Sequence, residues 1–181
     1  MSFSASSEEE LLCLDIKTPK DSLTILTDSV LPGETNALNN LFGGELLARM
    51  DRAASISASR HAEEIVVTSS VNNVSFGKAI SIGTTVTIEA KVSRAFTTSM
   101  EVFIDVWVDD KSGKKIKANE AIYTFVAVDK FGKPTKIDKI HPETQEEKER
   151  YEAALRRKQL SLVLAGKMNA NDATELKALF S

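Results

Sequence analysis

Four segments in the middle of the chain alternate apolar and polar side chains. They cover residues 65–76, 84–94, 99–108 and 116–128. A period of two is typical of half-buried strands, so the pattern predicts four β-strands. The connections between them are short, and two have the Gly-rich or Asp-rich composition of hairpin turns. We therefore expect consecutive strands to pair as antiparallel neighbours.

A fifth strand and a long helix are predicted ahead of these segments. Residues 22–27 have the composition of a strand, and the turn residues of 31–36 follow them. Residues 45–62 contain no Gly or Pro and show helical spacing. Seven apolar or small side chains share an arc of about 140° on this helix. They are Leu46, Leu47, Met50, Ala53, Ala54, Ser57 and Ala58. Glu45, Arg49, Arg52, Ser59 and Arg60 occupy the far side. Because about half of the inner arc is Ala or Ser, we expect close packing against a sheet.

The strand predicted at 99–108 has one fully apolar face and one mixed face. Phe103 and Trp107 lie on the mixed face, which suggests partial burial against another subunit. The order of one strand, one helix and four strands indicates an α+β fold, a small antiparallel sheet around one helix.

The two ends differ from this central unit. Residues 1–20 form an arm without a clear hydrophobic period. Thr144 and Glu147 form a capping box for a charged helix that runs to about residue 165, and Gly166 ends it. Residues 173–180 predict one more short helix. We expect this tail to dock on the outside, with Arg156, Arg157 and Lys158 as a solvated face or, less readily, as contacts to an anionic ligand.

Composition excludes several classes of function. The chain has 181 residues, 42% hydrophobic and 27% charged, with a formal net charge of −3. Its one cysteine, Cys13, allows no intramolecular disulfide, and one thiol with two histidines cannot form a structural zinc site, so no metal is expected. No membrane span or secretory signal is evident, which predicts a cytoplasmic protein without a membrane partner. The absence of a basic block argues against a nucleic-acid partner.

Asp51 is unusual because it lies in mid-helix, at the edge of the small-residue arc. Aspartate has poor helix propensity there and no capping role. It could be wetted by solvent, paired with a nearby Arg, or chemically active.

Upstream, Asn40 precedes Gly43 and Gly44, which either allow a tight approach of the helix to the sheet or admit a ligand to its free N–H groups. An amide, a helix N-terminus and a carboxylate together suit acyl hydrolysis, because the donors stabilise an oxyanion and the carboxylate activates water or attacks directly.

The spacing of these groups restricts how they can cooperate. Gly43 and Asp51 are eight residues apart, which separates them by about 12 Å along one helix. One carbonyl can hardly reach both. If they cooperate, Asp51 must come from a neighbouring subunit whose helix runs antiparallel, so this hypothesis predicts an obligatory dimer with two equivalent sites.

Several motifs occur in an order that resembles a known family, the hotdog-fold acyl-CoA thioesterases of the cytosolic acyl-CoA hydrolase type. The resemblance covers about residues 22–134. It rests on Pro32, Thr35-Asn36, Asn40, Phe42-Gly43-Gly44, Met50-Asp51, Val66-Val67-Thr68, Phe76, Ile80-Ser81-Ile82-Gly83, Val106-Trp107-Val108 and Thr124-Phe125-Val126-Ala127-Val128-Asp129.

The resemblance implies a hotdog fold, in which a five-stranded antiparallel sheet wraps a central helix. The expected domains are an arm at 1–20, a thioesterase domain at 21–134 and a helical extension at 135–181. Asp51 matches the catalytic carboxylate and Asn40 the second catalytic position, contributed from opposite sides of a homodimer, with trimers of dimers as the common assembly. For coenzyme A, which is part of the substrate and leaves no separate cofactor, the candidate contacts are Arg94, Thr98 and Ser99, with Lys78 as a weaker one.

Two other functions remain open on the same fold. A non-catalytic acyl-CoA sensor is disfavoured by the presence of both Asn40 and Asp51. A dehydratase generally needs a His near the helix entrance, whereas His61 lies at the far end, where we expect it to cap the C-terminus. His141 lies in a polar loop and is expected to be solvated.

Overall fold

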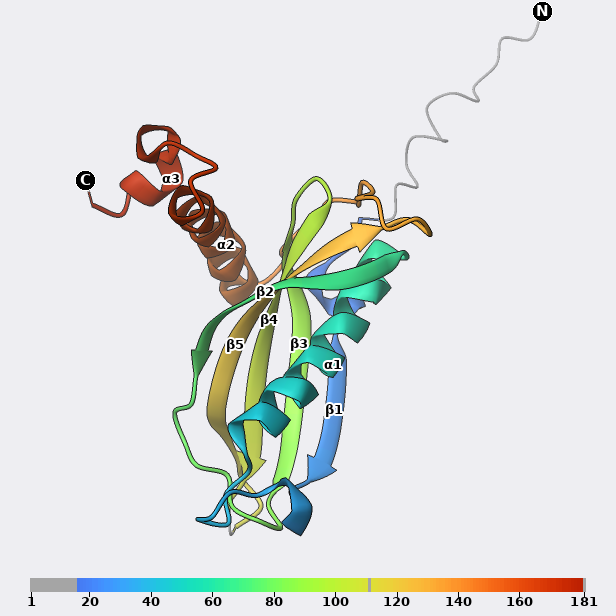
Figure 1. The fold of residues 1–181 in the computed structure, drawn as a ribbon, viewed down its shortest axis with the longest axis vertical. Helices are drawn as coiled ribbons and strands as arrows, with labels where there is room; N and C mark the ends of the chain where they lie inside the picture. The colour runs from blue at the N-terminus through green and yellow to red at the C-terminus, as the bar shows by residue number, and fades with distance from the viewer. Residues whose placement is uncertain (1–15, 111, 181) are drawn as a thin grey trace, which may run out of the picture.

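The computed structural model describes residues 16–110 and 112–180, and its central layer is a five-stranded antiparallel sheet with the strand order β1-β3-β4-β5-β2. A long helix, α1, lies across one face of this sheet (Figure 1). The strands are β1 (Thr24–Ser29), β2 (Ile65–Ser75), β3 (Thr85–Ala95), β4 (Ser99–Asp109) and β5 (Lys115–Val128); the helices are α1 (Gly43–Ala62), α2 (Gln145–Leu164) and α3 (Thr174–Lys177). The predicted α+β fold and all five strands are confirmed. The arm predicted at 1–20 lies mostly outside the described residues.

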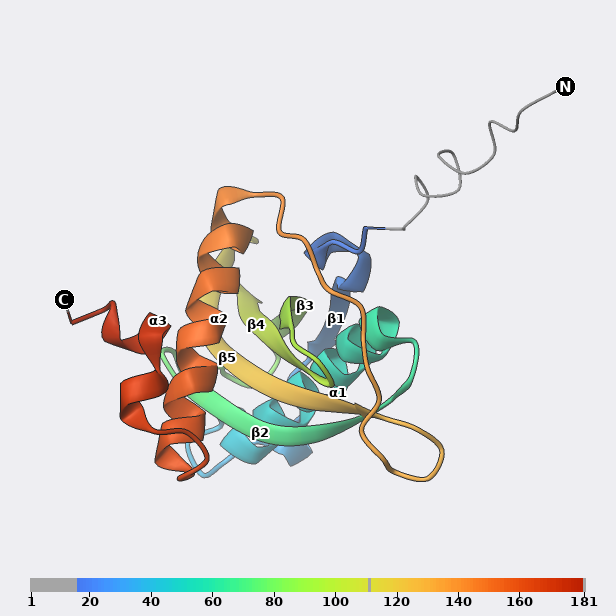
Figure 2. The same ribbon diagram turned by 90° about the horizontal axis from the view of Figure 1, so that it is seen from above.

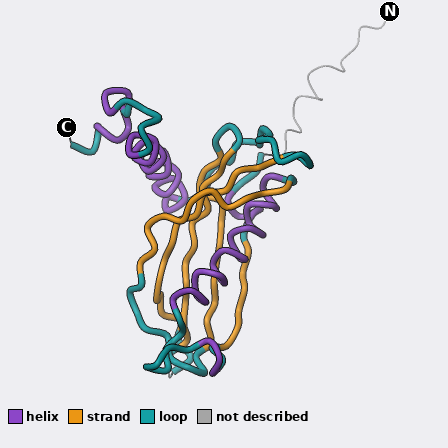
Figure 3. The backbone as a smooth tube through the Cα atoms, viewed as in Figure 1, coloured by secondary structure: helices purple, strands orange, loops and turns teal. Residues whose placement is uncertain are grey.

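The pairing of β2 and β3 differs from the prediction. These consecutive strands are not neighbours, because β2 pairs with β5 and β3 lies between β1 and β4. The connecting segment 76–84 instead crosses one end of the sheet and contacts the loop before α1. There the Leu41 N–H donates to the Ile80 carbonyl at 2.7 Å, and Asn40 forms a β-bridge with Ser81. Figure 3 shows these loops gathered at one end of the sheet.

The inner arc of α1 packs against the sheet as expected. Ala53, Ala54, Ser57 and Ala58 are fully buried, so the helix approaches the strands closely.

Arg49 was expected on the solvent side of α1, and this prediction is wrong. Its side chain is buried and reaches the loop that follows β1, where Nη2 lies 2.6 Å from Glu34 Oε2 and donates to the Ser29 carbonyl at 3.2 Å. The guanidinium also lowers the pKa of Glu34. A long Arg stem allows burial of the side chain while its head finds acceptors. Arg49 therefore fixes the loop that leads to Asn36 and Asn40.

His61 does not cap α1 as predicted. The cap residue is Glu63, which has the left-handed backbone conformation, whereas His61 is buried with Nε2 2.9 Å from the Asp138 carbonyl oxygen. Burial lowers the pKa of His61. His61 thus connects the end of α1 to the segment that leads toward α2. His141 is exposed, as expected.

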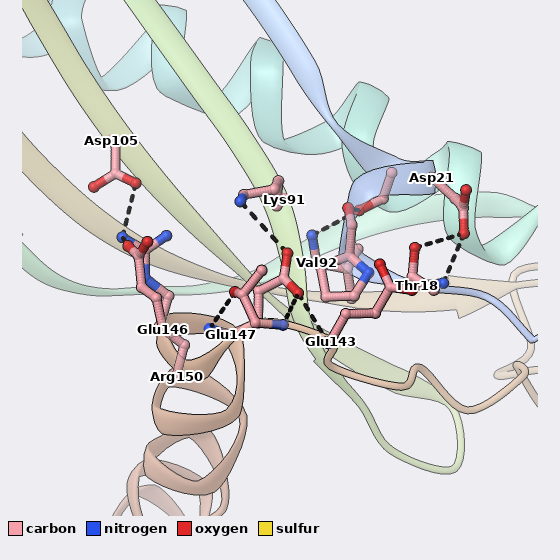
Figure 4. A network of polar contacts seen from close by, with 12 residues as sticks. Thr18, Asp21, Lys91, Val92, Asp105, Glu143, Glu146, Glu147 and Arg150 are labelled. Atoms are coloured by element: carbon pink, nitrogen blue, oxygen red, sulfur yellow. Dashed lines mark hydrogen bonds and ion pairs between the residues drawn. The ribbon is translucent and has the colours of Figure 1, made fainter.

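Helix α2 begins against the sheet face opposite α1, as the view from above in Figure 2 shows. The predicted capping box is confirmed: Thr144 Oγ1 accepts from the Glu147 N–H, and the Glu147 carboxylate accepts from the Thr144 N–H. The same carboxylate lies 3.7 Å from Lys91 Nζ, while Arg150 Nη2 donates to Asp105 Oδ2 at 2.9 Å (Figure 4). These contacts anchor the first half of α2 to β3 and β4.

Arg157 and Lys158 do not form a solvated face as predicted, because both contact β4 or the β3–β4 turn. Arg157 donates two hydrogen bonds to the buried Glu101 carboxylate, at 2.7 and 2.9 Å, and the Lys158 ammonium lies 3.6 Å from the centre of the Phe96 ring. Arg150 covers Phe103, its guanidinium 3.8 Å from the ring centre. The partial burial of Phe103 therefore comes from α2 of the same chain. The local sequence could not show that this face of α2 meets β4.

Candidate active site

The first turn of α1 presents unpaired backbone donors. The helix starts at Gly43, and its N-cap residue Phe42 makes no side-chain cap. The N–H groups of Gly43, Gly44 and Glu45 find no acceptor among the residues that the structure describes. Donors of this kind, at the positive end of the helix dipole, suit an anion or a polarised carbonyl.

The steric surroundings of the two glycines differ. A Cβ at Gly44 would lie 3.0 Å from a carbon of the Phe42 ring, so a larger residue there would push this exposed ring aside by a few tenths of an ångström. A Cβ at Gly43 would lie 3.6 Å from the Phe76 ring, which is ordinary contact. Gly43 lines a pocket, which supports the approach of a ligand, whereas the close contact at Gly44 is with Phe42 of the preceding loop and not with the sheet.

A pocket of about 410 Å³ opens at this end of α1. Its polar lining comprises Asn36, Asn40, Gly43, Lys78 and Asn119; its apolar lining comprises Leu38, Leu41, Leu46, Phe76, Ala79 and Ile80. Asn40 Oδ1 accepts a hydrogen bond from Ser81 Oγ at 3.2 Å, so the 76–84 connection fixes the predicted catalytic amide. Asn36 Oδ1 accepts from the N–H groups of Leu38 and Asn40 and shapes the loop between them.

Asp51 lies away from this pocket, two turns further along α1. It is half-buried, and its Oδ1 accepts a hydrogen bond from Thr68 Oγ1 of β2 at 2.9 Å. In the described part of the chain no Arg or Lys lies within ion-pair distance of it. The alternative of an aspartate neutralised by an arginine therefore finds no support here. One chain brings Asn40 and Gly43 together and leaves Asp51 outside, as the 12 Å spacing requires.

Tyr123 of β5 lies close enough to Asp51 to feel its charge. Burial, and then the negative charge of Asp51, raise the pKa of Tyr123 to about 12. Its hydroxyl therefore stays protonated near neutral pH and donates to the Leu47 carbonyl at 3.2 Å. This contact makes Tyr123 a support for the middle of α1.

The candidate coenzyme A contacts fall at two ends of the sheet. Lys78 lines the pocket beside Asn40. Arg94, Thr98 and Ser99 lie at the other end, around the β3–β4 turn. Arg94 is partly engaged already, since its Nη1 donates to the Tyr151 carbonyl at 2.9 Å and its guanidinium stacks 4.1 Å from the Tyr151 ring centre.

A basic groove of about 630 Å³ lies between this turn and α2. Its charged lining is Arg94, Lys136, Lys139 and Lys158, and Phe96 and Tyr151 supply aromatic surface. Burial, and then the charge of Arg94, lower the pKa of Lys158. Ser99 Oγ is 3.5 Å from Lys158 Nζ, at the margin of hydrogen bonding.

No role was predicted for Thr68 or Asn119 from the sequence. Thr68 belongs to a motif of the family resemblance, but its contact with Asp51 depends on how β2 lies beside α1, which local periodicity does not reveal. Asn119 could have been recognised from the sequence as a polar residue on a buried face. The alternation of residues 116–128 places it on the same face as Ala121, Tyr123 and Phe125. An amide on that apolar face is an exception to the pattern.

The strand beside Asp51 is an open sheet edge. β2 is the last strand of the order, and its Ile65, Val67 and Val71 are exposed, as is Phe76 just beyond it. Unpaired backbone groups and apolar side chains along an edge favour pairing with another chain.

The described residues offer neither a cluster of metal ligands nor a membrane-spanning helix. Among residues 16–110 and 112–180, no group of three or more His, Cys, Asp or Glu side chains could hold a metal ion. Within the same residues, no helix combines the length and the apolar character that crossing a bilayer would need.

Comparison with known proteins identifies the family. The family model described as the thioesterase superfamily matches residues 38–114. The uncharacterized acyl-CoA thioester hydrolase YkhA of Bacillus subtilis is 41% identical over 129 residues, which cover 71% of this chain and 75% of YkhA. A crystal structure of an apo-hexameric acyl-CoA thioesterase has a TM-score of 0.78 at 38% identity and covers 82% of this chain and 96% of its own.

A third relative has been solved with ligands. The acyl-CoA hydrolase of Staphylococcus aureus in complex with butyryl coenzyme A, coenzyme A and coenzyme A disulfide has a TM-score of 0.77 at 35% identity, covering 90% of this chain and 99% of its own. Mutants of that hydrolase carry alanine in place of an aspartate, an asparagine or a threonine. The chain described here belongs to the thioesterase superfamily, among its hotdog-fold acyl-CoA thioester hydrolases.

Proposed function

We propose that the protein hydrolyses acyl-CoA to a free carboxylic acid and coenzyme A at a site shared between two subunits. Asp51 of one subunit acts as general base or nucleophile. Asn40 of the other orients water or the thioester carbonyl, and the N–H groups of Gly43 and Gly44 hold the developing oxyanion. This arrangement needs neither a metal nor a separate cofactor.

One observation carries the proposal. The uncapped N-terminus of α1 opens into a pocket with Asn40, while the half-buried Asp51 lies outside that pocket and makes no ion pair within the described residues. Each half of the chemistry is thus incomplete within one chain. Two antiparallel copies of α1 would bring Asp51 of each copy toward the pocket of the other.

The exposed edge of β2 supports such a dimer. Antiparallel pairing of two β2 strands would continue the sheet across both subunits and cover the apolar side chains beside Asp51. A two-fold axis between the strands also places the two α1 helices antiparallel. A trimer of dimers is the expected further assembly, in line with the hexameric relative.

The Staphylococcus aureus mutants support the choice of Asp51. In that hydrolase the replaced asparagine lies fifteen residues before the replaced aspartate, and the threonine seventeen residues after it. Asn36 and Thr68 stand at the same spacings from Asp51. The correspondence favours Thr68 as the group that positions the carboxylate, and makes Asn36 a second candidate, beside Asn40, for the amide.

For the coenzyme A part of the substrate, the two ends of the sheet take different roles. Lys78 is placed to contact the portion nearest the thioester, since it shares the pocket with Asn40. Arg94 and Ser99, with Thr98 in the same turn, lie by the basic groove, whose positive charge suits the phosphates of the nucleotide end. A cytoplasmic location stays a prediction.

A dehydratase finds no support from the two histidines. His61 lies at the far end of α1 and holds the Asp138 carbonyl, and the backbone N–H of the exposed His141 donates to the Lys17 carbonyl. Neither histidine lies at the helix entrance.

The test is release of coenzyme A, measured with a free-thiol dye on wild type and on Asp51→Asn. Loss of the carboxylate should lower kcat/KM by at least about 100-fold, because general-base catalysis contributes about two to four orders of magnitude. Size-exclusion chromatography should give the same oligomer for both proteins. Unchanged turnover in Asp51→Asn would remove the mechanism, and a wild-type protein that binds acyl-CoA without releasing thiol would favour the sensor.

A further inference from the structure

Asn119 is a buried amide on an otherwise apolar surface. It lies on β5 opposite Val106 of β4, as Ala121 lies opposite Ile104, so its side chain shares the sheet face that packs against α1. Only 4% of the residue is exposed. Around it this face consists of side chains such as Val106, Ala121 and Ile88.

Both polar atoms of this amide lack a partner in the part of the chain that the structure describes. Among the described residues, Asn119 Oδ1 and Nδ2 are both buried without a hydrogen-bond partner. An unpaired buried amide destabilises the fold, and an apolar side chain of the same size would avoid that cost. The position of the amide indicates what it pairs with, because Asn119 lines the same pocket as Asn40 and Gly43.

The pocket has an exposed rim and a buried floor. Leu38, Phe76 and Lys78 are exposed, whereas Leu41, Leu46 and Ile80 are buried, together with Asn119. This further step rests on the proposed function, in which the thioester carbonyl lies at the Gly43 N–H. The coenzyme A arm must then lead outward past the rim to solvent, so the acyl group is the part of the substrate that enters toward the floor.

The chemistry of the floor restricts which acyl group fits. A carboxamide offers donors on Nδ2 and an acceptor on Oδ1, so a hydroxyl satisfies both of its atoms and a keto oxygen satisfies the donor. A plain alkyl chain satisfies neither and leaves the amide buried without a partner. Sites that hydrogen-bond a substrate oxygen reject the analogue that lacks it more strongly than apolar pockets distinguish one methylene.

We propose that Asn119 is a specificity-determining residue that hydrogen-bonds an oxygen substituent on the acyl group, so that hydroxyacyl or oxoacyl thioesters of coenzyme A are hydrolysed in preference to plain alkyl ones of equal length. Asn119 contacts the substrate and takes no part in the attack on the thioester.

The test compares two substrates that differ by one hydroxyl, 3-hydroxybutyryl-CoA and butyryl-CoA. Thiol release gives kcat/KM for both with wild type, with Asn119→Leu, and with Asn171→Leu as a matched change at an exposed position in the C-terminal region. Wild type and Asn171→Leu should prefer the hydroxylated substrate by about 10-fold or more. Asn119→Leu should lower that ratio by at least about 10-fold, mainly through the hydroxylated substrate, with an equal or higher thermal unfolding midpoint. Asn119→Ala, which cannot overfill the pocket, repeats the comparison if the leucine variant does not fold.

Two results would overturn the assignment. If the ratio of kcat/KM for the two substrates is the same in wild type and in Asn119→Leu, the amide does not contact the acyl group. An equal loss on both substrates would place the amide against the part of coenzyme A that they share. Both results require thiol release by the wild type, whereas failure of the wild type to hydrolyse any acyl-CoA would contradict the proposed function itself.

Discussion

The hydrogen bond from Thr68 to Asp51 makes the candidate carboxylate directly testable without removing it. Thr68 Oγ1 donates to Asp51 Oδ1 at 2.9 Å, and no other hydrogen-bond donor to this carboxylate occurs in the described chain. Thr68→Val replaces the hydroxyl with a methyl group of similar size on a β-branched side chain that still suits a strand. The change therefore removes one hydrogen bond and little else.

Its expected magnitude follows from the charge of the acceptor. A hydrogen bond to a charged group is worth about 1.5–3 kcal/mol, which corresponds to roughly 10-fold to 100-fold in rate if the bond orients the reacting carboxylate. We expect the upper end of this range in the proposed dimer, because the partner subunit would cover β2 and shield Thr68, which is exposed in the single chain.

The assay is kcat and KM for butyryl-CoA hydrolysis by Thr68→Val, with Thr68→Ser as the matched control that retains the hydroxyl. The loss should appear in kcat, and Thr68→Ser should recover most of it. Equal activity of wild type and Thr68→Val, or equal impairment of the valine and serine variants, would refute the role of this hydrogen bond.

Two further predictions concern the helix entrance and the pH dependence of stability. Gly44→Ala should displace the Phe42 ring, which would lie 3.0 Å from the new Cβ. It should therefore lower kcat/KM more than Gly43→Ala does, since the new Cβ at Gly43 would lie at an ordinary 3.6 Å from the Phe76 ring. Equal effects of the two variants in the thiol assay would contradict this order. Burial lowers the pKa of His61 in the folded chain, so the unfolded chain binds a proton at this residue more readily. The free energy of unfolding should therefore fall as pH drops below about 6.5 toward the folded-state pKa. Urea titrations between pH 5 and 8 should show a smaller pH dependence for His61→Gln, which retains a donor for the Asp138 carbonyl, and an unchanged dependence would show that other groups cause it.

The local sequence pattern was sufficient to predict the helices and strands, but it did not predict which of them contact one another. The small-residue arc of α1, the period of two in the strands and the Thr144–Glu147 capping box each act within a few residues, so the sequence reveals them directly. The neighbour of β2 depends on a connection that crosses the sheet end, and no short motif encodes it. The same limit explains Arg49 and Arg157, whose acceptors, the Glu34 and Glu101 carboxylates, lie on other elements.

The candidate site shows the same division. The position of Asp51 on α1 and the spacing to Gly43 follow from helix geometry alone, and they predicted that one chain would separate the two groups. The contact of Thr68 with Asp51 depends on how β2 meets α1, so the sequence could not predict it. Arg94 and Lys158 were candidates for anion binding, but the groove that unites them forms only where α2 meets the β3–β4 turn. Asn119 was visible as a polar residue in an apolar register, but only the pocket gives that exception a meaning.

Whether two subunits share each site is decided most directly by mixing two defective proteins. Asp51→Asn and Asn40→Ala chains are purified separately, dissociated together in mild denaturant and allowed to reassociate at equal concentrations, with each variant treated alone as the control. Random pairing makes about half of the dimers mixed, and each mixed dimer holds one intact site of two, so the account predicts recovery of about one quarter of wild-type thiol release. Activity no higher than the average of the two variants, in a mixture shown by native mass spectrometry to contain mixed dimers, would contradict it.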